Sequence, residues 1–201
     1  CSNIEIINNI AKGTRPPGMG YRYRGSGGGV LIINSDPVFT DINITNNYAG
    51  EYGAGVYALY SSPIFNNFII SGNGGSGNLQ KGGGVLCEGT PNAIFIDGSI
   101  LDNGNADIGL APYMGGGIFV GPAPFDSSSS FYAQLINVNI FSNVSRMWGG
   151  GVAGSGISIS GGTIKENTAI YFGGGVYQGG HIYSIGNIDF SPLNRVSVYS
   201  N

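Results

Sequence analysis

The chain has 201 residues, of which only 9% are charged, 38 are glycine and 41% are hydrophobic, and its formal net charge is −3. Intrinsic disorder is excluded, because disordered chains combine few aromatic residues with a high net charge, whereas this one has 12 Tyr and 10 Phe. The sequence contains no run of 18 apolar residues, so no transmembrane helix is predicted. A net charge this small gives no general attraction to nucleic acid.

A glycine-rich tetrad recurs along the chain at intervals of 24 to 34 residues. Periods of this length are typical of solenoids, in which each repeat is one structural unit. Six registered copies argue against a flexible linker, and no Lys-Ser/Thr follows the glycines as a phosphate-binding loop would require. The copies are 27–30, 53–56, 82–85, 115–118, 149–152 and 173–176.

A second motif, Ile-x-x-Asn, precedes each tetrad. Its isoleucines are Ile6, Ile44, Ile70, Ile100, Ile140 and Ile164, and its asparagines are Asn9, Asn47, Asn73, Asn103, Asn143 and Asn167. The last residue of the tetrad stands nine positions after the Asn in three copies and 12, 15 or 21 positions after it in the others. We interpret the longer distances as loop insertions at one corner. A degenerate seventh copy is expected over Ile185, Asn187 and Phe190, with Leu193 at the Asn position.

Two more columns appear when the copies are aligned on these asparagines. The residue five before each Ile is apolar, and the residue three before it is small and mostly an amide or an acid. The apolar column is Cys1, Phe39, Phe65, Phe95, Leu135 and Ile159, and the second is Asn3, Asp41, Asn67, Asp97, Asn137 and Gly161.

Short β-branched segments with Gly and Asn at fixed corners predict an all-β fold, a single right-handed parallel β-helix of about seven coils over residues 1–201. Equivalent residues of successive coils would then stack about 4.8 Å apart. Apolar ladders fill the interior and Asn ladders hydrogen-bond along a corner. Glycine suits the corner because it adopts φ > 0 without a Cβ clash. Right-handedness follows from the handedness of parallel crossovers, and we expect one or both ends to be uncapped.

The two motifs together carry a family resemblance. Ile-x-x-Asn followed by Gly-Gly-Gly-Val resembles the Phe-x-x-Asn and Gly-Gly-Ala-Ile/Leu/Val motifs of the chlamydial polymorphic membrane proteins, over about residues 1–193. Ile stands where that family has Phe. The resemblance implies a pectin-lyase-like solenoid that is extracellular or displayed on a cell surface, often as an adhesin, and it does not fix a ligand.

Two carboxylates are the candidates for catalysis. Asp41 and Asp97 share a column two coils apart, or roughly 10 Å, and glycoside hydrolysis needs two carboxylates about 5–10 Å apart. They are the pair expected of a polysaccharide-cleaving enzyme. We favour the alternative, a corner ladder in which Asp replaces Asn. The lone His181 and the two cysteines show no metal-ligand spacing, so neither a cofactor nor a metal is expected.

The cysteines have different interpretations. Cys87 is expected to be a small core residue, in a coil about two turns from Cys1 and too far from it for a disulfide. Cys1 either fills the apolar column or is the acylated first residue of a lipoprotein.

Two surface features are candidate binding sites. Loop 10–26 interleaves basic and aromatic residues, which suit sugars, acidic glycans or a protein partner, although it also fits a solvated corner loop. Its candidates are Arg15, Tyr21, Arg22, Tyr23 and Arg24, beside Lys12. The second feature is the row after each tetrad's Val, expected to point outward as an assembly interface unless loops fold over it. That row contains Leu31, Tyr57, Leu86, Phe119, Ala153 and Tyr177.

These observations favour a non-enzymatic extracellular or cell-surface protein that serves adhesion or structural assembly. The expected partners are further copies of the chain, packed end to end or laterally as in a filament, and a glycan or a surface protein of a host or neighbouring cell. The alternatives are a polysaccharide-binding or polysaccharide-cleaving β-helix and a passive spacer.

Overall fold

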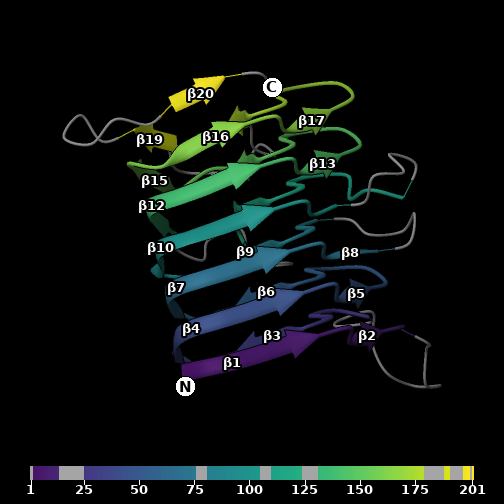
Figure 1. Ribbon diagram of the computed structural model, residues 1–201, viewed down its shortest axis with the longest axis vertical. Coiled ribbons are helices and arrows are strands. Elements are labelled where there is room, and N and C mark those ends of the chain that lie inside the picture. Colours follow the sequence, from purple (N-terminus) through teal and green to yellow (C-terminus); the bar gives the residue numbers. More distant parts are fainter. Residues whose placement is uncertain are drawn as a thin grey trace.

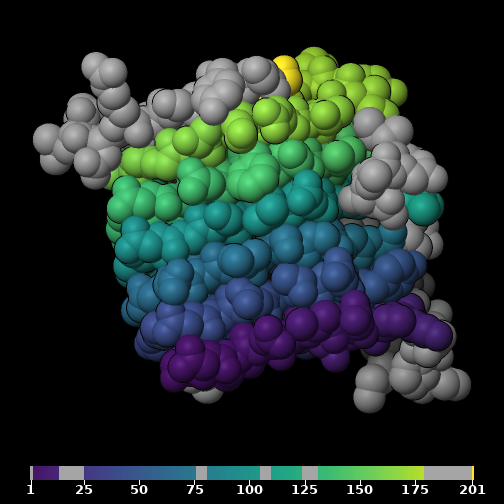
Figure 2. Space-filling model, in the orientation of Figure 1, coloured from purple at the N-terminus to yellow at the C-terminus, as the bar shows by residue number. Residues whose placement is uncertain are grey.

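A computed structural model of the chain describes residues 2–13, 25–75, 81–104, 110–123, 131–178, 188–190, 197–199 and 201. They form a parallel β-helix in which each sequence repeat is one coil (Figure 1). In Figure 1 the front strands run from left to right, the strands behind run back, and each coil lies above the last, so the helix is right-handed as predicted. Figure 2 shows the coils as stacked bands in sequence order.

Two large parallel sheets form the walls of the coil. The long sheet contains β1 (Ser2–Ile7), β4 (Val38–Thr45), β7 (Ile64–Ser71), β10 (Ala93–Leu101), β12 (Ala133–Phe141), β15 (Ile157–Ser160), β16 (Thr163–Lys165), β19 (Ile188–Phe190) and β20 (Ser197–Tyr199). The second sheet contains β3 (Val30–Ile33), β6 (Val56–Leu59), β9 (Val85–Glu88), β11 (Ile118–Gly121), β14 (Val152–Gly154) and β18 (Val176–Gln178). Short strands line the remaining corner: β2 (Ile10–Ala11), β5 (Tyr48–Ala49), β8 (Gly74–Gly75), β13 (Val144–Ser145) and β17 (Thr168–Ala169).

The predicted isoleucine column is confirmed as the centre of the core. Ile70, Ile100 and Ile140 are paired in register across β7, β10 and β12, and the column is fully buried from Ile44 to Ile164. The apolar column beside it stacks ring on ring, with Phe39 and Phe95 at centroid distances of 4.8 and 5.1 Å from Phe65. Parallel pairing in one register therefore places like side chains in continuous ladders.

The amide-and-acid column marks a bend within the long strands. Its members have left-handed backbone conformations, with φ between 49° and 55° from Asn3 to Asn137 and 72° at Gly161. Asn, Asp and Gly are the residues that reach this region at low cost. The bend turns each long strand from one wall of the coil into the next, and in the sixth coil it divides the strand into β15 and β16.

The asparagine ladder is continuous and buried through the middle of the molecule. The backbone N–H and the side-chain Nδ2 of Asn73 both donate to Asn103 Oδ1, each at 3.0 Å, and Asn103 makes the same two bonds to Asn143. The second Nδ2 proton of Asn103 bonds to the Ile70 carbonyl of the preceding coil at 2.9 Å. Every polar atom of the Asn103 amide thus has a partner, as a buried amide requires.

Glycines follow each ladder asparagine for two different reasons, with three in every tetrad except 53–56, where Ala54 takes the middle position. The first glycine of each tetrad has φ between 54° and 66°, as at Gly82. The second and third instead lie against the neighbouring coil. A Cβ on Gly116 would lie 2.5 Å from the Gly150 carbonyl oxygen, and one on Gly84 would lie 2.9 Å from Asn103 Nδ2. The tetrad and the asparagine ladder therefore pack directly on each other, which explains why the two motifs occur together.

The predicted register of the seventh copy is wrong. Phe190 pairs with Ile159, in the apolar column, and not with the isoleucines. Val198 pairs with Ile164. Asn201 Oδ1 accepts hydrogen bonds from the backbone N–H and the side-chain Nδ2 of Asn167, at 3.0 and 3.1 Å. Val198 and Asn201 thus occupy the Ile and Asn positions of the motif in this coil, eight residues further along the chain than the expected Phe190 and Leu193. Ile185, Asn187 and Leu193 lie outside the described residues.

The insertions predicted between the ladder asparagine and the tetrad fall mainly on 14–24, 76–80 and 105–109, which lie outside the described residues. A further long connection joins β11 to β12, at the corner between the second sheet and the long sheet.

An isosteric substitution tests the ladder. Asn103→Asp keeps the shape of the side chain but removes the Nδ2 protons, so carboxylate oxygens would face the Ile70 carbonyl and Asn143 Oδ1. Burying such an unsatisfied, charged group costs about 3–5 kcal/mol, and we expect the midpoint of urea unfolding to fall accordingly. Asn139→Asp makes the same change at an exposed position of β12 and should leave the midpoint nearly unchanged. Equal midpoints for both variants would contradict the ladder.

Candidate functional site

The row after each tetrad's Val lies on the outer face of the second sheet but is not an exposed strip. Tyr57, Leu86 and Phe119 are only 2%, 0% and 7% exposed, so the predicted exposure of these three residues is wrong. Leu31 is exposed and Tyr177 is half-buried. The buried members form a second hydrophobic cluster, separate from the core, which we call the outer cluster: Tyr57, Leu59, Leu86, Phe119, Ala123 and Ala153, with Tyr52, Tyr60 and Met114 packed against it.

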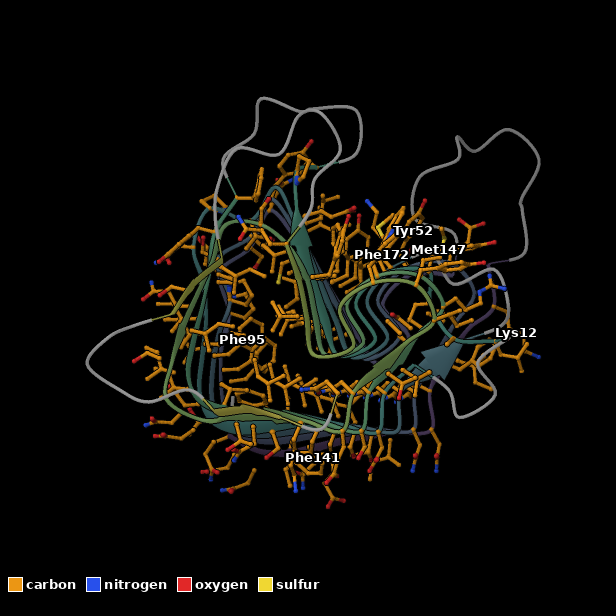
Figure 3. All side chains as sticks on the ribbon, turned by 90° about the horizontal axis from the view of Figure 1, so that it is seen from above. Lys12, Tyr52, Phe95, Phe141, Met147 and Phe172 are labelled. Atoms are coloured by element: carbon orange, nitrogen blue, oxygen red, sulfur yellow. The ribbon has the colours of Figure 1, made fainter. Side chains whose placement is uncertain are left out.

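The turn made by each tetrad brings the chain back across this row. The first glycine approaches the outer row closely: a Cβ on Gly53 would lie 2.8 Å from Tyr57 Cβ, and one on Gly82 would lie 2.8 Å from Leu86 Cβ. The residue before each tetrad therefore covers the row. These residues form a ladder of single bridges: Ser26, Tyr52, Lys81, Met114, Trp148 and Phe172. In Figure 3, which looks along the coil, Tyr52 and Phe172 both lie outside the second sheet, although they belong to different coils, whereas Phe95 lies inside the coil.

Sequence reasoning missed this covering column, although a signal was present. Five of its six members are large side chains that stand immediately before the first glycine of a tetrad. A large residue at one fixed position of a repeat indicates a packing partner, in the same way as the isoleucine column.

A charged pair lies within the outer cluster. Glu88, at the end of β9, is fully buried; its Oε1 lies 2.6 Å from Lys81 Nζ and its Oε2 accepts a hydrogen bond from the Tyr57 hydroxyl at 2.8 Å. Lys81 Nζ also lies 4.9 Å from the centre of the Phe119 ring. Burial, together with the nearby charges of Glu88 and Glu51, raises the pKa of Tyr52. The hydrogen bond from Tyr57 to Glu88 joins two neighbouring coils, and the Lys81–Glu88 pair within one coil neutralises the buried carboxylate.

Cys87 lies on the opposite, inner face of β9, as predicted for a core residue. Burial of its thiol, with a smaller contribution from the Glu88 charge, raises its pKa to about 12, and a hydrogen bond with Thr90 acts in the other direction. The thiolate is the reactive form of cysteine. This thiol therefore stays protonated and unreactive at neutral pH.

Asp41 and Asp97 lie in the exposed bend column, and each contacts an asparagine of the next coil. Asn67 Nδ2 donates to Asp41 Oδ1 at 2.5 Å, and Asn137 Nδ2 donates to Asp97 Oδ1 at 3.0 Å. Asn67 lies between the two carboxylates in the order of the stack. A shallow depression of about 630 Å³ is lined by Asp41 and Asn67 but not by Asp97. This geometry supports the corner ladder over a catalytic pair.

Aromatic side chains become exposed where the outer cluster reaches the last coils. Trp148 and Tyr177 stack at a centroid distance of 5.9 Å with 15° between their planes, and Phe172 lies 6.2 Å from Tyr177. Tyr171 is 64% exposed, Phe172 57% and the adjacent Ile170 52%. We call Trp148, Tyr171, Phe172 and Tyr177 the aromatic platform, the described feature best suited to contact another molecule.

The other predicted candidates fall outside the described residues: Arg15, Tyr21, Arg22, Tyr23 and Arg24 of loop 10–26, with Cys1 and His181. Within the described part of the chain, no helix is long and apolar enough to span a membrane, and no three His, Cys, Asp or Glu side chains are grouped to hold a metal ion.

Comparisons with protein-family models, with curated proteins and with solved structures each found no match.

Removal of the lysine tests the buried pair. Lys81→Met keeps an apolar stem over Phe119 but leaves the Glu88 carboxylate with a single hydrogen-bond partner, and breaking a buried pair in this way costs about 3–5 kcal/mol. Lys81→Met combined with Glu88→Leu removes both charges and should recover most of that stability, because an apolar replacement of a buried pair is often neutral. Urea unfolding measures both effects, with exposed Lys12→Met as control. A Lys81→Met variant as stable as the parent would show that the pair does not stabilise the fold.

Proposed function

We propose that the chain is a non-enzymatic, extracellular or cell-surface β-helix that serves adhesion or structural assembly, with the aromatic platform as its contact surface. The observation that carries the proposal is the exposure of Tyr171 and Phe172, each more than half accessible, beside the stacked pair Trp148 and Tyr177. Aromatic residues are enriched in binding interfaces because one rigid side chain supplies a large contact area. The resemblance of the repeat motifs to chlamydial surface passengers points the same way.

The arrangement of the carboxylates supports a non-enzymatic role. A general acid or base must reach the substrate proton. Glu88 is closed off by Tyr57 and Lys81, and Asp41 and Asp97 each accept a hydrogen bond within the bend ladder. A polysaccharide-cleaving enzyme is the competing function, and Asp41 and Asp97 are its candidate catalytic residues.

The two aspartates separate these functions. Asp41→Asn and Asp97→Asn replace each acid by the amide that already occupies other coils of the same column, so we expect the double variant to fold and bind like the parent. Assays for reducing ends and for unsaturated uronates on a panel of glycans should detect no product from either protein. Cleavage by the parent that either substitution abolishes would overturn the non-enzymatic function.

Adhesion is measured directly with beads coated with the full chain and exposed to bacterial and eukaryotic cells. We expect adherence that falls several-fold for Tyr171→Ser combined with Phe172→Ser. Tyr132→Ser alters a partly exposed aromatic residue directly before β12 and should retain adherence. Light scattering of the soluble chain tests assembly in parallel. A chain that adheres to no cell type and stays monomeric at high concentration would contradict the proposal.

A further inference from the structure

We infer that the aromatic platform is a carbohydrate-binding site that takes the ring of a neutral polysaccharide. The inference rests on the proposed function and specifies the chemistry of the partner. It is carried by the geometry of the rings, by the size of the exposed patch and by the charges around it.

The rings left exposed for stacking are those of Tyr171 and Phe172, each more than half accessible. Trp148 covers one side of Tyr177, with centroids 5.9 Å apart and planes nearly parallel. Tyr177 belongs to β18, the edge strand of the second sheet, and among the described residues no strand lies beyond it. Phe172 lies beside this ring at 34° to its plane. Tyr171 and Phe172 lie 6.5 Å apart with 36° between their planes, so two exposed rings stand side by side, a surface on which a flat six-membered ring can stack.

A pyranose presents the complementary surface. One face of the sugar ring carries several C–H groups, whose hydrogens are weakly positive, while an aromatic ring carries negative charge on its face. Stacking buries the C–H face on the aromatic ring and leaves the hydroxyl groups at the rim of the sugar free to bond with water or with backbone groups.

The size of the patch favours a sugar over a protein. An aromatic side chain offers about 150–250 Å², so Tyr171 and Phe172, at 64% and 57% exposure, present roughly 100–150 Å² each. With Ile170 the exposed apolar area is about 300–400 Å². A stable protein interface buries about 800 Å² on each partner, which this patch alone does not provide, whereas it is ample for one or two sugar rings.

The charges favour a neutral polymer. The two described cations between β12 and β18 are already stacked on other rings: Arg146 lies 4.1 Å from the centre of Tyr113, and Lys165 lies 5.6 Å from that of Phe141. The chain as a whole carries a net charge of −3, which weakly repels polyanions. Sulfated or uronate-rich polymers should therefore bind less well than neutral ones.

The chain contains one tryptophan, Trp148, so its intrinsic fluorescence reports from the platform itself. We expect a neutral polysaccharide from a panel of β-glucan, mannan, galactan and xylan to change the Trp148 emission saturably and to retard the chain in affinity electrophoresis. Heparin and polygalacturonate should have little effect. Phe172→Ala and Tyr177→Ala should each weaken binding at least tenfold. Phe172→Tyr, which keeps a ring, and the distant Tyr132→Ala should bind like the parent.

The outcomes separate this inference from the proposed function. Unchanged Trp148 emission and electrophoretic mobility with every neutral polymer would overturn the carbohydrate site, as would binding that survives both alanine substitutions. If the coated beads still adhere to cells in that case, adhesion stands and its partner is a protein. Thermal melting of each variant checks that the coil is intact, and because Phe172 is exposed, its substitution should leave the melting temperature within a few degrees of the parent.

Discussion

The amide hydrogen bonds of the asparagine ladder fix the position of each coil on the one before. Asn103 Nδ2 bonds at once to the Ile70 carbonyl of the preceding coil and to Asn143 Oδ1 of the following one, so a shift of register by one residue would break both bonds. The ladder is buried from Asn47 to Asn167, where an unmade hydrogen bond costs most. This constraint holds the isoleucines of successive coils in register, and the apolar core follows from that register.

The same ladder determines what the glycines do. Because Asn103 Nδ2 would lie 2.9 Å from a Cβ on Gly84, the third position of the tetrad admits no side chain. The first glycine then turns the chain back over the second sheet, and residues such as Tyr52 and Met114 come to cover Tyr57 and Phe119. One corner thus supports two hydrophobic layers, the core inside the coil and the outer cluster outside it.

The fold could be predicted from sequence because its determinants are periodic, while the features of the outer cluster depend on single residues. Isoleucine and asparagine recur without exception in six copies, and each column maps onto one ladder. The burial of Leu86 could not be predicted from alternation alone, because alternation gives the face of the sheet to which a side chain points but not what lies above that face. Glu88 stands where the paired strands carry Leu59 and Gly121, so its partners Lys81 and Tyr57 became evident only in three dimensions. The seventh coil was misplaced because Val198 replaces the isoleucine and its distance from Phe190 is longer than in the other copies.

The division between ladder and outer row also explains why a binding surface would arise at the platform. Inside the coil each position is constrained by identical neighbours above and below, so a change in one coil disturbs two others. The outer row also packs against its neighbours, but it tolerates a wider range of sizes, from Ala153 to Phe119 and Tyr177. Ala153, which is paired with Tyr177, has a small side chain. Beside it, Trp148 and Tyr177 stack on each other, and the aromatic surface continues to Phe172 and Tyr171. Binding specificity can therefore change at this row without a change in the core, because these side chains point away from it and the asparagine ladder runs along a different corner.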